Sequence, residues 1–253
     1  MYFDRRKYKQ FSLKQLQGRW GYAILISFII TLVSSIFDIP QLIRIYSETF
    51  RITAETYSQA LQTTESLQDL YYELYNRLNE IRNTYGSFFE QLLRGAIDAV
   101  LIVAALNFFI KMSKTPEKIS LSAFLEGFAD WWRALLAFLW KYLWIHIWML
   151  LFIIPGIVKI FAYSQTEYLL AEYKNLSPTK AVKISNIITR GYKWEIFVMA
   201  LSFLGWEILC AFSFGIGYIF LLPYRKMTYI NAYHAMLKDA VECGKISMED
   251  LYE

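Results

Sequence analysis

Residues 20–37 read WGYAILISFIITLVSSIF, a run of 18 residues without a charged side chain. At a rise of about 1.5 Å per residue, a helix of this length nearly crosses the hydrocarbon core of a bilayer. The run is longer than a signal-peptide core, and no small-residue cleavage site follows it. We therefore expect a first transmembrane helix that stays in place as a signal anchor.

Five further segments are predicted to cross the membrane, because long apolar runs recur and the charges fall in blocks between them. Pro155 and Gly156 break the chain between two of these segments, and Gly215 to Gly217 supply a turn before the last one. Of all residues, 56% are hydrophobic and 19% are charged, against about 25% charged in soluble domains. The fold class is thus all-α, a polytopic membrane helical bundle of about six transmembrane helices, with crossings at residues 20–37, 91–110, 134–154, 157–173, 195–213 and 218–236.

Lys and Arg predict the orientation of these helices. Residues 174–194 hold five Lys or Arg and no acid, whereas residues 38–90 hold four beside eight acids. The positive-inside rule places the basic segments in the cytoplasm and residues 38–90 outside. Both termini are then cytoplasmic, with cytoplasmic segments at 1–19, 111–133, 174–194 and 237–253. In the alternative, residues 157–173 and 218–236 lie on the membrane surface.

The outer segment, residues 38–90, is predicted to form a helical hairpin. Between Pro40 and Gly86 there is neither Gly nor Pro, and apolar or small residues recur at spacings of four and three. Such a heptad pattern is typical of helices that pack along a seam, as in a coiled coil. One unbroken helix cannot return to the same membrane face, so we expect a turn near residues 62–66. The segment is either a spacer or a docking surface for a protein partner.

Residues 174–194 contain a predicted amphipathic helix. Ser177 caps it, Pro178 takes its first position and Gly191 ends it. Its Lys and Arg side chains are expected to face anionic lipid headgroups, while Ala181, Ile184 and Ile188 face inward. The basic residues 1–19 are predicted to be a second interfacial anchor.

Six ionisable residues lie inside the predicted crossings, where a charge is costly enough to suggest a function. Lys141 and Glu167 reach similar depths if residues 134–154 and 157–173 form an antiparallel hairpin, so an ion pair is expected. Near the outer surface, Asp98, Lys159 and Glu207 can form a cluster of two acids and one base.

His146 lies near the middle of the bilayer, where it either relays protons or makes a hydrogen bond that supports packing. We favour the packing role for His146. For the charged residues the structural interpretation is that paired side chains hold the helices together, and the functional one is a polar path for an ion or small substrate.

The sequence gives no support to catalysis or to a cofactor. Zinc-ligand spacings, phosphate loops, dinucleotide fingerprints and GxSxG motifs are absent. Cys210 and Cys243 do not form a disulfide framework, and the net charge of +4 is explained by membrane orientation rather than by nucleic acid. We expect a protein that is not an enzyme, with no catalytic, metal or cofactor residue.

Residues 155–209 and 214–237 resemble a family of bacterial membrane proteins called domain of unknown function 975. The resemblance rests on PGI at 155–157, RG-x-KW-x-x-F at 190–197 and GIG-x-x-x-x-x-PY at 215–224, with LQGRWG at 16–21 similar to the entry of the family's first helix. It implies a polytopic protein of the bacterial cytoplasmic membrane and implies no reaction. Residues 38–90 have no counterpart in this resemblance.

Three functions agree with these observations. The first is a non-enzymatic envelope or membrane-assembly factor that presents a helical hairpin outside. The second is a transporter or permeation protein that uses the charged residues within the membrane. The third is an immunity or resistance protein against a membrane-active toxin.

Overall fold

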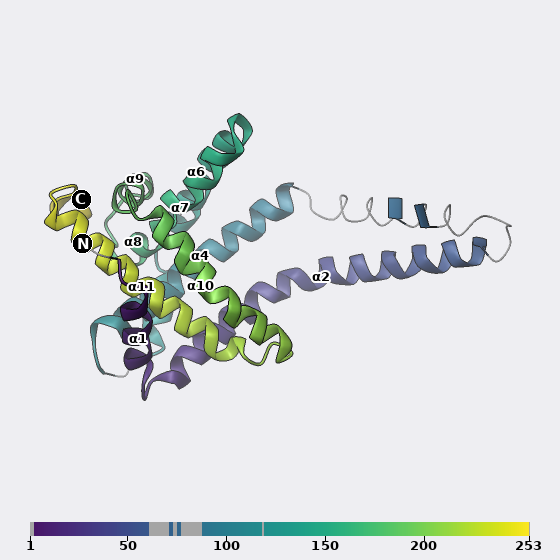
Figure 1. The fold of residues 1–253 in the computed structure, drawn as a ribbon, viewed down its shortest axis with the longest axis horizontal. Helices are drawn as coiled ribbons and strands as arrows, with labels where there is room; N and C mark the ends of the chain where they lie inside the picture. Colours follow the sequence, from purple (N-terminus) through teal and green to yellow (C-terminus); the bar gives the residue numbers. More distant parts are fainter. Residues whose placement is uncertain (1–2, 61–70, 73–74, 77–87, 118, 253) are drawn as a thin grey trace. The chain divides into compact units, whose positions relative to one another are not determined.

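The computed structural model describes residues 3–60, 71–72, 75–76, 88–117 and 119–252. Within these ranges the regular elements are helices, and none is a strand (Figure 1). The chain divides into two compact units, residues 1–30 with 96–253 and residues 31–95. The elements are α1 (Arg5–Leu16), α2 (Trp20–Ala60), α4 (Phe88–Lys114), α5 (Ser122–Leu125), the 3-10 helix η1 (Glu126–Phe128), α6 (Trp131–Leu151), α7 (Ile153–Ala162), α8 (Thr166–Glu172), α9 (Pro178–Ile188), α10 (Lys193–Phe212), α11 (Tyr218–Glu242) and α12 (Glu249–Tyr252).

Three described helices are long and apolar enough to cross a membrane: Glu90–Lys114, Trp131–Leu151 and Lys193–Phe212. They coincide with the crossings predicted at residues 91–110, 134–154 and 195–213. A fourth candidate is the pair formed by α1 and the described start of α2, which bends by 104°. The bend lies next to Gly18, whose φ of +74° favours glycine.

The segment predicted as a crossing at residues 157–173 is divided in the structure between α7 and α8, of 10 and 7 residues. Residues 218–236 lie within α11, which has 25 residues and carries Pro223 inside it. Neither segment is among the helices that are long and apolar enough to cross. A total of six crossings therefore stays a prediction.

The α6–α7 hairpin turns at Phe152, earlier than Pro155 and Gly156. Phe152 has extended backbone, with φ −154° and ψ 129°, and it ends α6 at Leu151 instead of at the predicted residue 154. Pro155 is accommodated in the first turn of α7, where backbone N–H groups have no partner within the helix. Gly156 lies so close to Met149 that a Cβ there would be 2.9 Å from the Met149 Cα. The two helices therefore touch at the backbone.

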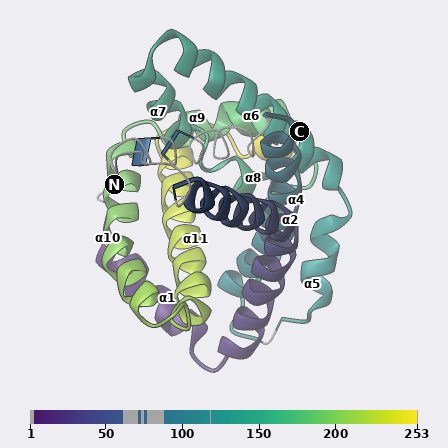
Figure 2. The same cartoon turned by 90° about the vertical axis from the view of Figure 1, so that its right-hand side faces the viewer.

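The α10–α11 hairpin turns at the predicted glycines. Gly215 has a φ of +86°, and the preceding Phe214 has a φ of +52°. The Ser213 hydroxyl donates to Cys210 O at 2.8 Å and accepts the N–H of Gly217 at 3.0 Å. α10 and α11 then run side by side (Figures 1 and 2).

Helix α1 packs against α11 through polar side chains. Asn231 of α11 donates from Nδ2 to Ser12 Oγ at 2.9 Å and to Gln15 Oε1 at 2.8 Å. Gln15 Nε2 donates in turn to Ser113 O at the end of α4, at 2.9 Å. The basic residues 1–19 thus contain a helix that joins two other helices of the unit.

Helix α9 begins as predicted, with Ser177 at the N-cap position and Pro178 at the first position, but the Ser177 side chain makes no capping hydrogen bond. The helix ends at Ile188, and Gly191 follows with a φ of +94°. Its buried residues include the three that the sequence predicts to face inward, and they pack against α6, α8 and α11. Ala181, Ile184 and Ile188 thus contribute to the protein core.

In the second unit, α2 continues through Pro40 to Ala60. Glu48 and Arg51 form an ion pair of 2.6 Å along this helix, and Ile43, Tyr46 and Phe50 are 62%, 72% and 78% exposed. Residues 71–72 and 75–76 are also helical. The predicted turn near residues 62–66 lies outside the described residues.

Candidate functional site

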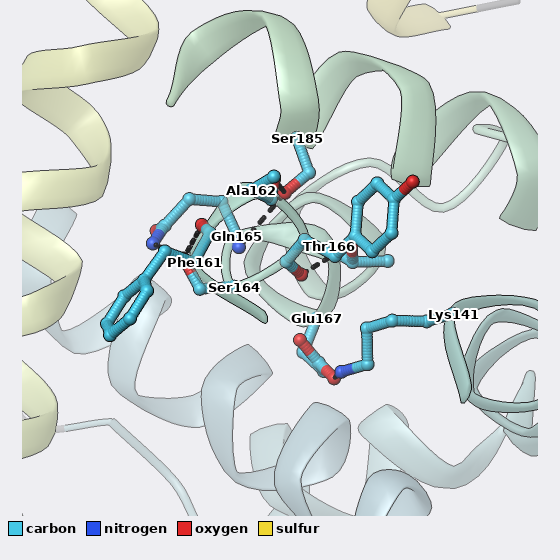
Figure 3. A network of polar contacts seen from close by, with 9 residues as sticks. Lys141, Phe161, Ala162, Ser164, Gln165, Thr166, Glu167 and Ser185 are labelled. Carbon is cyan, nitrogen blue, oxygen red and sulfur yellow. Dashed lines mark hydrogen bonds and ion pairs between the residues drawn. The ribbon is translucent and has the colours of Figure 1, made fainter. Parts of the chain in front are cut away.

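The predicted ion pair between Lys141 and Glu167 is present. Lys141 of α6 donates from Nζ to Glu167 Oε1 of α8 (Figure 3). The two side chains are 20% and 16% exposed, so the pair is largely buried inside the protein. Because a buried charge without a partner is costly, this contact fixes α8 against α6.

The break between α7 and α8 is held by a side chain of α9. The Ser185 hydroxyl donates to Ala162 O at 2.9 Å and accepts the N–H of Gln165 at 3.1 Å (Figure 3). Thr189 Oγ1 also lies 3.1 Å from Ala162 O. Backbone groups that lose their helical partners must be satisfied elsewhere, so α9 supplies what the divided helix lacks.

The same break leaves one polar atom without a partner. Gln165 is 2% exposed, and its Nε2 donates to Ser164 Oγ at 2.8 Å. Its oxygen Oε1 is buried and has no hydrogen-bond donor among the described residues. Buried polar atoms of this kind are rare enough to mark a place where a further group can bind.

Glu207 has a different basic partner from the one that the sequence suggests. Its carboxylate accepts a hydrogen bond from Arg225 Nη1 of α11. The sequence predicted a cluster of Glu207 with Lys159 and Asp98. It did not predict Arg225 as the partner, because the α10–α11 turn determines which residues face each other. Arg225 lies 18 residues after Glu207, and its position inside a predicted crossing was the signal that could have found it.

Lys159 of α7 lies over two aromatic rings. Its Nζ is 5.2 Å from the centre of the Trp148 ring and 5.4 Å from that of Tyr163, distances typical of cation–π contacts. It is also close enough to Lys193 for the two charges to interact. Lys159 thus contacts aromatic rings, whereas the sequence predicted contacts with Asp98 and Glu207. Asp98 lies in α4 and also interacts with another group of the protein.

His146 makes a local contact in α6. Its Nδ1 is 2.8 Å from Tyr142 O, and its ring lies 3.8 Å from the Tyr142 ring. A hydrogen bond to this carbonyl requires a proton on Nδ1. The His146 side chain is exposed and both contacts lie within α6, so its packing role stays a prediction.

A further polar cluster joins three helices at a place that spacing did not indicate. Glu172 Oε1 of α8 forms an ion pair of 2.5 Å with Lys114 Nζ at the end of α4. His234 Nε2 of α11 lies 3.5 Å from the same carboxylate oxygen. Nearby, Arg133 donates from Nη2 to Tyr173 O at 2.8 Å. These residues are far apart in the sequence, so only the tertiary fold brings them together.

The segment between α4 and α6 closes onto α4 through Glu126 of η1. Lys111 Nζ lies 2.5 Å from Glu126 Oε2. This hydrogen bond, together with the positive charge of Lys111, holds the pKa of Glu126 below its ordinary value. Asn107 Nδ2 of α4 donates to Ala123 O at 2.7 Å. These contacts stabilise a connection that the sequence predicted as a loop.

Residues 153–240 match the model of a family described as a protein of unknown function, DUF975. The match confirms the resemblance seen in the sequence for α7 to α11. The Glu207–Arg225 pair lies wholly inside the DUF975 segment, whereas the Lys141–Glu167 pair joins that segment to α6 outside it.

Comparisons with curated proteins and with solved structures find no match to the chain. Within the described ranges no group of three or more His, Cys, Asp or Glu is arranged to hold a metal ion. Lys141 with Glu167 and Glu207 with Arg225 form contacts from one helix to the next, and this is the arrangement from which a function must be inferred.

Proposed function

We propose that the chain is a non-enzymatic integral protein of the bacterial cytoplasmic membrane, an envelope or membrane-assembly factor. In this proposal the helices of the first unit anchor the chain, and residues 38–90 form the outer hairpin that docks a protein partner. The proposal keeps both termini in the cytoplasm, as the distribution of Lys and Arg predicts.

The observation that carries the docking role is the apolar face of α2. Ile43, Tyr46 and Phe50 follow each other at spacings of three and four, which places them on one face of the helix. All three are more than 60% exposed. This face belongs to the predicted heptad seam, which can pack against a second helix. In this proposal the second helix belongs to a protein partner, since large exposed apolar and aromatic residues on one face are typical of interaction surfaces.

The charged residues support an anchoring role for the first unit. Lys141 with Glu167, and Arg225 with Glu207, are each engaged in an ion pair between helices. Paired charges let polar helices pack in an apolar environment at a lower cost than single ones. This use of the charges favours a structural role over a substrate path.

A replacement of residues 46–88 by a short flexible linker tests the proposal. In cells that lack the protein, envelope integrity is measured by dye uptake after complementation with either form. We expect the linker variant to reach the membrane at normal abundance and to fail in complementation. Full complementation by the linker variant would exclude a docking role for the outer segment.

The permeation alternative is favoured by one observation, the break between α7 and α8. Broken helices line the binding sites of many transporters, because their free backbone groups contact the substrate. In that case Asp98→Asn or Glu207→Gln abolishes flux in proteoliposomes while abundance stays normal. Reduced abundance of the folded protein supports the structural role instead.

A further inference from the structure

A pocket of about 430 Å³ lies in the first unit between α4, the α7–α8 break and α11. This volume is in the range of small-molecule sites, about 300–1,000 Å³. One wall is apolar and consists of Ile102 and Leu106 of α4. The opposite walls are polar and basic, and they consist of Ser164, Gln165, Tyr168, Arg225, Lys226 and Tyr229.

The pocket has more positive than negative charge. Arg225 is paired with Glu207, but Lys226 points its ammonium group over the Phe109 ring, at 5.7 Å from the ring centre. Among the described residues no carboxylate lies within ion-pair distance of Lys226. Lys226 and Arg225 thus place two positive charges side by side with one carboxylate, that of Glu207. A second anion bound there would lower the cost of burying the Lys226 charge.

The pocket also offers hydrogen-bonding groups. The hydroxyls of Tyr168 and Tyr229 can donate to an anion from two different helices. Gln165 also lines the pocket, and its Oε1 is buried without a donor; a ligand hydroxyl can supply a donor once the side chain rotates toward the pocket. The polar side therefore suits a group that combines a phosphate with free hydroxyls.

The apolar wall distinguishes a lipid from a free anion. Ile102 is 38% exposed, so one apolar side chain of this wall is open to the outside of the unit, whereas Leu106 is buried at 2% exposed. An acyl chain can lie along this surface, while a free phosphate gains nothing from it. We propose that the pocket binds the headgroup of an anionic phospholipid that carries glycerol hydroxyls, with Lys226 and Arg225 on the phosphate. This inference does not depend on the docking role of the outer segment, and it requires the alternative in which residues 157–173 and 218–236 lie at the membrane surface, because a headgroup does not enter the hydrocarbon core.

The test uses the full-length protein, delipidated in a neutral detergent. Short-chain phosphatidylglycerol and phosphatidylcholine of equal chain length are titrated, and bound lipid is counted by native mass spectrometry. We expect preferential binding of phosphatidylglycerol, and a loss of about tenfold or more in its affinity for Lys226→Gln, because a charge-assisted contact is removed. Lys226→Arg retains the charge and should retain binding.

Lys238→Gln is the matched control, because Lys238 lies on the same helix and is exposed, 66% in its side chain. It should bind phosphatidylglycerol as the unchanged protein does. If Lys226→Gln fails to fold, Tyr229→Phe tests the same pocket without a charge change and should weaken binding by a smaller factor.

Three results overturn the inference. The first is equal affinity of the unchanged protein for the two lipids. The second is unchanged binding of phosphatidylglycerol to folded Lys226→Gln. The third concerns inorganic phosphate, which is titrated separately by calorimetry. If phosphate binds as tightly as phosphatidylglycerol and Lys226→Gln weakens both equally, the pocket binds a free anion rather than a lipid.

Discussion

The chain turns back on itself in two hairpins, α6–α7, which α8 continues, and α10–α11. The two differ in how the returning helix is built and held. Each has a glycine at close approach and one ion pair between its helices. A serine that both donates and accepts holds each of them, Ser185 of α9 for the first and Ser213 of the turn itself for the second. In the first hairpin the returning helix is divided, and its pair, Lys141 with Glu167, is 20% and 16% exposed. In the second the returning helix is continuous, and its pair, Arg225 with Glu207, is 39% and 33% exposed.

The comparison shows how burial decides what an ion pair does. A buried pair contributes little net stability by itself, yet removal of one partner is costly, because the other charge stays in a poorly solvated place. In a more exposed pair the long Arg side chain can extend to the membrane interface and exchange its partner for headgroup oxygens or water. We therefore expect the first hairpin to depend on its pair and the second to tolerate its loss.

The largest effect is expected for Glu167→Gln. This change leaves Lys141 without its carboxylate, and the free energy of unfolding should fall by about 3 kcal/mol. The measurement is the midpoint of unfolding in an SDS titration, followed by circular dichroism. The exchanged variant Lys141→Glu with Glu167→Lys should recover part of the loss. An exchange that is no better than either single change would contradict the pairing.

The next effect is expected for Gly156→Ala. A Cβ at this position would lie 2.9 Å from the Met149 Cα and 2.3 Å from its Cγ, so α6 and α7 must separate at a cost of about 2 kcal/mol. Gly217→Ala in the other hairpin should cost less, because its nearest contact is the Cys210 Sγ, at 2.6 Å, which can rotate away. Gly205→Ala has nothing within 4 Å and should be neutral or slightly stabilising. The same unfolding titration ranks the three variants, and a larger loss for Gly217→Ala would refute the backbone contact at Gly156.

Ser185→Ala tests the break between α7 and α8. It removes a hydroxyl that is 0% exposed and leaves a backbone donor without its partner at Gln165, at a cost of about 1.5 kcal/mol. Ser213→Ala makes the corresponding change in the α10–α11 turn, where the serine is only partly buried, and should cost less. Hydrogen exchange at Gln165 should accelerate in Ser185→Ala. Unchanged exchange there would show that α9 does not hold the break.

Of the two ion-pair variants, Glu207→Gln is expected to have the smaller effect. Its partner Arg225 is 39% exposed and can find other acceptors, so the loss of stability should be about 1 kcal/mol. The SDS midpoint measures this loss beside that of Glu167→Gln. Equal losses for the two variants would remove the distinction between the hairpins.

The sequence predicts some parts of this structure well. Apolar runs of sufficient length determine helices, so α4, α6 and α10 were predicted within a few residues. The limits of α9 followed from Pro178 and Gly191, because the preference of proline for the first turn and of glycine beyond the end is local. Ser177 takes the N-cap position without a capping hydrogen bond from its side chain. The Lys141–Glu167 pair could be predicted because depth along two antiparallel helices follows from the helix rise alone.

Other parts depend on contacts between elements that are distant in the sequence. The division of residues 157–173 into α7 and α8 is held by Ser185, which belongs to another helix. The early turn at Phe152, ahead of Pro155, is accompanied by close packing of Gly156 against Met149. No pattern within either segment carries this information.

By itself, the sequence of this protein determined the helical class, the apolar helices and one ion pair, because these follow from hydropathy, capping and helical rise within single elements. The tertiary structure alone decided that Glu207 meets Arg225, that Lys159 meets aromatic rings, and that Lys226 lies beside a pocket. The physical reason is that a charge takes whichever partner the packing of its helices brings within reach. That packing depends on turns and on close backbone contacts.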